Sequence, residues 1–165
     1  MLVRTLVAMV ALVAGSIGGA PGAAVGTAKG SMTVAGTAST LTHVHAFPKK
    51  VFGRPAVLLV FSDVDLSAAD AADDAKLSTL ANAGKLHALG ILIGDDPSGK
   101  AAAISNEIYD QGLKGRMSIG GEDTLEGHKG DATSTSGRLF LKTPKKFENG
   151  VTFTYDVTFN APIER

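Results

Sequence analysis

The stretch "VTFTYDVTFN", residues 151–160, alternates strictly between two kinds of side chain. The odd positions carry Val151, Phe153, Tyr155, Val157 and Phe159. The even positions carry Thr152, Thr154, Asp156, Thr158 and Asn160. Because successive side chains of a strand point to opposite faces, we expect one face of this strand in a core and the other in water. This pattern is typical of antiparallel sheets, and Pro162 is expected to end the strand.

Seven earlier segments are also expected to be strands, separated by Gly, Pro, Asp and Asn residues. They are residues 31–36, 40–47, 55–62, 85–93, 100–110, 112–123 and 133–143. Residues 55–62 form a continuous apolar run, which is typical of a central strand buried on both faces. Residues 100–110 contain three alanines that favour helix, but the turn just before them favours the return arm of a hairpin. The remaining stretch, 122–131, is expected to be a polar loop.

One helix is expected between the third and fourth strands. Ser67 and Asp70 form the S-x-x-D pattern of a helix start, and Gly84 is a suitable residue to end it. Leu77 and Leu80 belong to a narrow apolar stripe, so the helix is expected to lie on a sheet. The sequence therefore predicts a mainly β fold, an antiparallel β-sandwich or small barrel of about eight strands with one inserted α-helix.

The first 24 residues have the order of a secretory signal peptide. Arg4 precedes an apolar run over 5–13, and small residues follow up to Ala24. The run is far shorter than the ~20 residues that span a bilayer, so no stable membrane span is expected after cleavage; a retained anchor is the alternative. We therefore predict a secreted or periplasmic protein, with residues 25–30 as a flexible lead and residues 31–163 as a single β-rich domain.

Composition excludes several chemistries. The chain has no cysteine, which rules out disulfides, thiolate zinc sites and cysteine nucleophiles. Its 16 basic residues balance 16 acidic ones without a basic stripe, so neither nucleic acid nor an anionic membrane is expected as a partner. Trp is absent, which makes an aromatic platform for sugars or bases less favoured.

Six short pieces occur in an order that resembles a known family. They are "MTVAG", "LTHVHAF", "VLLVFSD", "GKLHALGI", "GRLFL" and "TYDVTFNAPI", and together they reach from about residue 31 to 163. The chain thereby resembles a family of short, signal-peptide-bearing, Cys-poor bacterial secreted proteins to which no activity is assigned. The resemblance implies export and a single β-rich domain. It assigns no catalytic residues, and the middle of the chain, 95–131, matches least.

Histidines offer the one candidate metal site. His43 and His45 share one face of a predicted strand, about 7 Å apart, and His87 is the favoured third ligand for zinc or copper. In the simpler interpretation these are solvated or hydrogen-bonded strand residues. Their surroundings depend on the strand's orientation: they line the interior if Leu41 and Phe47 face the core, and lie outside if Val44 and Ala46 do.

Two other motifs are rejected. Residues 94–100, "GDDPSGK", approach a phosphate-binding loop, but Ala101 stands where Ser or Thr must hold Mg²⁺, so a hairpin turn is predicted. Asp63 and Asp65 lack the regularity of a calcium loop and are expected to lead into the helix. The sequence thus favours an exported, non-catalytic binding or structural module; the alternative is a histidine-coordinated metal site, with or without enzymatic activity.

Overall fold

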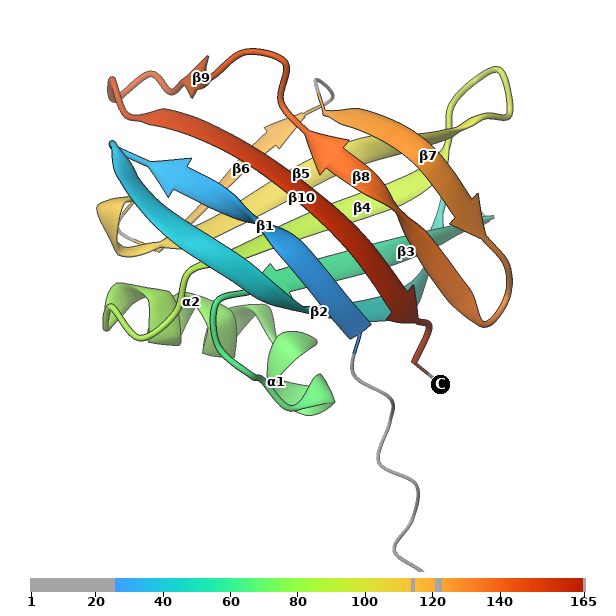
Figure 1. Ribbon diagram of the computed structural model, residues 1–165, viewed down its shortest axis with the longest axis horizontal. Helices are drawn as coiled ribbons and strands as arrows, with labels where there is room; N and C mark the ends of the chain where they lie inside the picture. Colours follow the sequence, from blue (N-terminus) through green and yellow to red (C-terminus); the bar gives the residue numbers. More distant parts are fainter. Residues whose placement is uncertain (1–25, 114, 121–122, 165) are drawn as a thin grey trace, which may run out of the picture.

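A computed structural model describes residues 26–113, 115–120 and 123–164. Within these residues the fold is one antiparallel sheet of ten strands that curls into a half-barrel (Figure 1). The strands are β1 (Gly26–Val34), β2 (Thr37–Val51), β3 (Arg54–Ser62), β4 (Ala88–Asp95), β5 (Ala101–Asp110), β6 (Gly115–Gly120), β7 (Thr124–Gly130), β8 (Ser134–Phe140), β9 (Lys145–Lys146) and β10 (Thr152–Pro162). Their order is β6-β5-β4-β3-β2-β1-β10-β8-β7, and β9 pairs with β10. The mainly β, antiparallel prediction is confirmed, whereas the predicted signal peptide lies outside the described residues.

The interior of the half-barrel is an apolar core to which β10 contributes every second residue. Phe153, Tyr155, Val157 and Phe159 are all buried, while Asp156 on the other face is exposed. Each large apolar side chain placed there stabilises the fold by roughly 1.5–3 kcal/mol. The alternation in residues 151–160 therefore predicted this strand correctly, including its end at Pro162.

Tight hairpin turns connect β1 to β2, β2 to β3 and β4 to β5. The β1–β2 turn places Ala35 and Gly36 at φ angles of 50° and 82°, and the β2–β3 turn places Phe52 and Gly53 at 49° and 79°. Two successive residues with positive φ are typical of the type I′ hairpin turn. The β4–β5 turn is held differently: the Asp96 carboxylate accepts hydrogen bonds from the backbone and hydroxyl of Ser98 and from the Lys100 N–H. This confirms the hairpin turn predicted for residues 94–100.

The predicted single helix is in fact two short ones, α1 (Ala68–Ala71) and α2 (Asp74–Asn82). Ser67 caps α1 as predicted, since the Asp70 N–H donates to its hydroxyl. The Asp73 carboxylate then accepts from two further backbone N–H groups and so starts a second helix. Gly84, at φ 66°, ends α2 with the paired carbonyl bonds of a Schellman motif. None of the described helices is long and apolar enough to cross a membrane.

Both helices pack on the outer face of the sheet, beside β3 to β5 (Figure 1). A second apolar core fills this contact and includes Val60, Leu77 and Tyr109. Leu59 and Phe61, which alternate with Val60 along β3, belong instead to the interior core. The prediction that residues 55–62 form a strand buried on both faces is thus confirmed over its second half.

Two segments differ from the sequence-based expectation. The predicted flexible lead, residues 25–30, largely belongs to β1, whose Gly30 pairs with Val157 of β10. Its small residues allow the backbones to approach closely. The predicted polar loop 122–131 largely forms β7, an edge strand that, among the described strands, pairs with β8 alone and carries a bulge between Glu126 and Lys129. An edge strand with a solvated face lacks the apolar alternation by which strands are recognised.

Candidate ligand-binding site

A pocket of about 430 Å³ opens at one end of the half-barrel; we call it the mouth pocket. Residues of three hairpins line it, β2–β3, β4–β5 and β7–β8. The β4–β5 and β7–β8 turns both lie at the right in Figure 1. The apolar parts of its wall are Ile93, which belongs to the interior core, and Val57 and Ile163, which pack against that core. The mouth pocket is therefore a continuation of the core to the surface.

The wall contributed by β7 and β8 carries a polar pair. His128 Nε2 lies 3.2 Å from the hydroxyl oxygen of Thr135, which is itself buried. Burial lowers the pKa of His128 from its ordinary value of 6.5, so the ring is neutral at pH 7. A neutral imidazole has one donor and one acceptor nitrogen. The pair can thus recognise a hydroxyl, carbonyl or carboxyl group without placing a charge in the pocket.

Gly130 makes room for this ring. A Cβ atom at position 130 would lie 3.2 Å from both Cε1 and Nε2 of His128, which is too close for an undisturbed contact. The absence of a side chain at Gly130 therefore allows the imidazole to lie over the strand end. Neither the sequence pattern nor the spacing of the histidines indicated this arrangement, because it depends on the pairing of β7 with β8.

Charged residues of both signs surround the mouth. Lys49, Lys50 and Asp95 line the rim. Asp131 also lies there, but its carboxylate accepts hydrogen bonds from Thr133 and Ser134, which lower its pKa. Asp131 therefore shapes the β7–β8 turn, and the two lysines provide cations for a polar end of a ligand.

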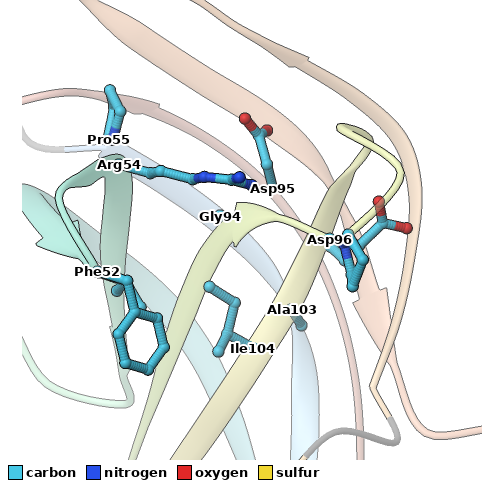
Figure 2. A pocket seen from close by; sticks show the side chains of 11 residues that line it. Phe52, Arg54, Pro55, Gly94, Asp95, Asp96, Ala103 and Ile104 are labelled. Carbon is cyan, nitrogen blue, oxygen red and sulfur yellow. The ribbon is translucent and has the colours of Figure 1, made fainter.

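A second pocket, of about 640 Å³, lies next to the mouth on the outside of the sheet. Figure 2 shows this outer pocket between the β2–β3 turn and the start of β5, with Phe52, Arg54 and Ile104 around it. Ile104 covers Gly94, whose missing side chain would clash with the isoleucine. Pro55, Gly94 and Asp95 line both pockets, so one layer of residues separates them.

The strand that carries His43 and His45 adopts neither of the two simple orientations. Leu41, Val44 and Ala46 all belong to the interior core, so the alternation breaks between Leu41 and Val44. The β1–β2 register shifts nearby, between Thr27 and Gly30. His45 consequently lies on the outer face yet is buried, because the segment leading into α1 covers it.

Both ring nitrogens of His45 are engaged by protein groups. Nδ1 lies 2.5 Å from a carboxylate oxygen of Glu164, and Nε2 lies 2.9 Å from the carbonyl oxygen of Leu66. A carbonyl only accepts, so Nε2 carries a proton and donates it. A metal ion at His45 would have to displace one of these partners.

The other two predicted ligands have partners of their own. His43 Nδ1 is 4.0 Å from the carboxylate of Asp65, and His87 Nδ1 is 2.7 Å from that of buried Asp110. No group of three or more His, Cys, Asp or Glu side chains among the described residues is placed to hold a metal ion. The histidine metal site stays a prediction. Its three histidines each lie beside a different carboxylate.

Comparison of the chain with protein-family models, curated proteins and solved structures found no match. The candidate site accordingly rests on the geometry and chemistry of this chain's own residues.

Proposed function

We propose that this protein is an exported, non-catalytic binding module whose mouth pocket takes a small, mostly apolar molecule. The observation that carries the proposal is the neutral His128, next to Thr135, in the wall of a pocket that continues the apolar core. Its volume of about 430 Å³ lies within the range of small-molecule sites, which commonly occur in the mouths of barrels. The ligand would bury its apolar body against Val57 and Ile93 and hydrogen-bond to His128.

Ligand binding is tested with the fluorescent dye 8-anilinonaphthalene-1-sulfonate, which combines an apolar ring system with one anionic group. We expect saturable binding that Val57→Phe weakens about tenfold or more, because the larger side chain occupies the pocket. Leu58→Phe is the matched control, since Leu58 packs on the opposite face of the same strand. Equal dye affinity in both variants would contradict the mouth pocket as the binding site.

The role of His128 is tested separately through Gly130. Gly130→Ala should push the imidazole from its position and weaken dye binding several-fold. Gly120→Ala introduces the same methyl group where a Cβ meets nothing within 4 Å, and it should leave binding unchanged. If the two alanine variants bind the dye alike, the ring does not contribute to recognition.

Export is supported by the N-terminal sequence, with its single early arginine, apolar run and small residues before position 25. The full chain, expressed in a bacterium, should appear in the periplasm or medium as a shorter product that begins near Val25. Mass spectrometry of the cell fractions measures this directly. A full-length chain retained in the cytoplasm or membrane fraction would contradict the proposal.

A further inference from the structure

The turn between β2 and β3 carries an aromatic side chain that the turn itself does not require. Phe52 has φ 49° and is followed by Gly53, and its side chain is fully exposed. The β1–β2 turn has the same backbone, with φ 50° at Ala35 followed by a glycine. Because alanine suffices there, the shape of the turn does not explain the phenylalanine. A bulky residue at positive φ is also unusual and points to a role outside the fold.

Three cations flank this ring. Residues 48–55 contain Lys49, Lys50 and Arg54 and no acidic residue, and none of the three forms a salt bridge with a described residue. The even charge balance of the whole chain conceals this local concentration. Figure 2 shows Phe52 and Arg54 extending from the turn in different directions, so the ring is not covered by its basic neighbour.

The carboxylates of the neighbouring hairpin offset these cations only in part. Asp96 accepts hydrogen bonds from Ser98 and Lys100 within its own turn, and these bonds lower its pKa. Asp95 forms no side-chain hydrogen bond or salt bridge with a described residue, and it lines the outer pocket. Within the described part of the chain, the β2–β3 tip thus combines one protruding aromatic ring with three cations that form no salt bridge, and Asp95 is the carboxylate left free beside them.

We propose that the tip of the β2–β3 hairpin docks on an anionic lipid surface. Phe52 enters the boundary between headgroups and acyl chains, where aromatic rings are favoured, and the three cations lie among the lipid phosphates. A single, fully exposed ring at the tip of a turn suits a fluid lipid surface better than a protein partner, whose interface needs a broad complementary patch. One aromatic ring and a few cations give reversible, salt-sensitive association.

The chain has no Trp, which allows a direct test. In Phe52→Trp the new ring is the only indole, and its emission should shift to the blue with vesicles of phosphatidylcholine and phosphatidylglycerol. It should shift far less with phosphatidylcholine alone. Ala35→Trp is the matched control, because the same ring then stands on the same kind of turn without flanking cations. Equal responses of the two variants, or no shift in Phe52→Trp, would overturn the proposal.

The contribution of charge is measured by sedimentation with the same mixed vesicles. Lys49→Gln combined with Lys50→Gln should lower the partition coefficient about tenfold or more. Lys142→Gln combined with Lys146→Gln removes the same charge elsewhere and should have little effect. Equal losses in the two double variants would show that only net charge matters and would refute docking by the hairpin. Because Lys49 and Lys50 also line the mouth pocket, Val57→Phe separates the two sites: it fills that pocket and should still bind vesicles normally.

Discussion

Substitution of Gly30 by alanine tests the most consequential pairing in the sheet. Gly30 lies in β1 opposite Val157 of β10. A Cβ atom there would lie 2.1 Å from the carbonyl oxygen of Asp156 and 2.5 Å from the Cα of Val157. Both are backbone atoms, so no change of rotamer relieves the overlap. The two strands must separate locally to admit the methyl group.

The expected cost is about 3 kcal/mol or more. Overpacking alone costs about 1–3 kcal/mol, and each ladder hydrogen bond weakened by the separation adds about 0.5–1.5 kcal/mol. A domain of this size then loses about 10 °C in its midpoint of thermal unfolding. Urea unfolding followed by circular dichroism measures the free energy, and Gly120→Ala, where a Cβ has open space, is the control.

A Gly30→Ala variant within about 0.5 kcal/mol of the wild type would refute this reasoning, since that is the effect of an ordinary surface substitution. It would mean that residues 26–30 behave as the flexible lead predicted from the sequence, rather than as the first strand of the sheet.

The remaining predictions concern histidines. Burial lowers the pKa of His128 in the folded chain below its ordinary value of 6.5. As the pH falls below 6.5, His128 is therefore protonated more readily in the unfolded chain than in the folded one. The free energy of unfolding should therefore be higher above pH 6.5 and decline below it, and His128→Asn should reduce this decline; identical pH dependences would contradict the account. Glu164→Gln should lower the free energy of unfolding by about 1.5–3 kcal/mol, because it weakens the short hydrogen bond to His45. Urea unfolding measures this, and an unchanged free energy would argue against that hydrogen bond. The metal hypothesis predicts about one equivalent of zinc or copper in the purified protein, lost when His43→Ala and His45→Ala are combined. A thermal midpoint unaffected by added zinc would contradict it.

Local signals predicted much of the fold because they depend on residues close in sequence. The alternation of β10, the apolar run of β3 and the cap at Ser67 each follow from the chemistry of a few neighbouring residues. The second cap, at Asp73, carries no distinct sequence signal, because Ala and Asp residues on both sides are compatible with one continuous helix.

The partners in the candidate site could not be predicted in the same way. Glu164 reaches His45 across 119 residues, and Thr135 meets His128 only through the pairing of β7 with β8. Lys49, Lys50 and Arg54 are close in sequence, but their prominence depends on a turn that places Phe52 at its tip. Such contacts follow from strand order and register, which short motifs do not specify.

The pairing of β1 with β10 also governs when the protein can fold. The strands nearest the two ends of the described chain lie side by side in the middle of the sheet (Figure 1). Contacts between residues so distant along the chain make folding slow, because a long loop must close before they form. During synthesis the sheet stays incomplete until the last strand emerges. For a chain exported as we propose, the pairing of β1 with β10 keeps the sheet incomplete until β10 has been synthesised.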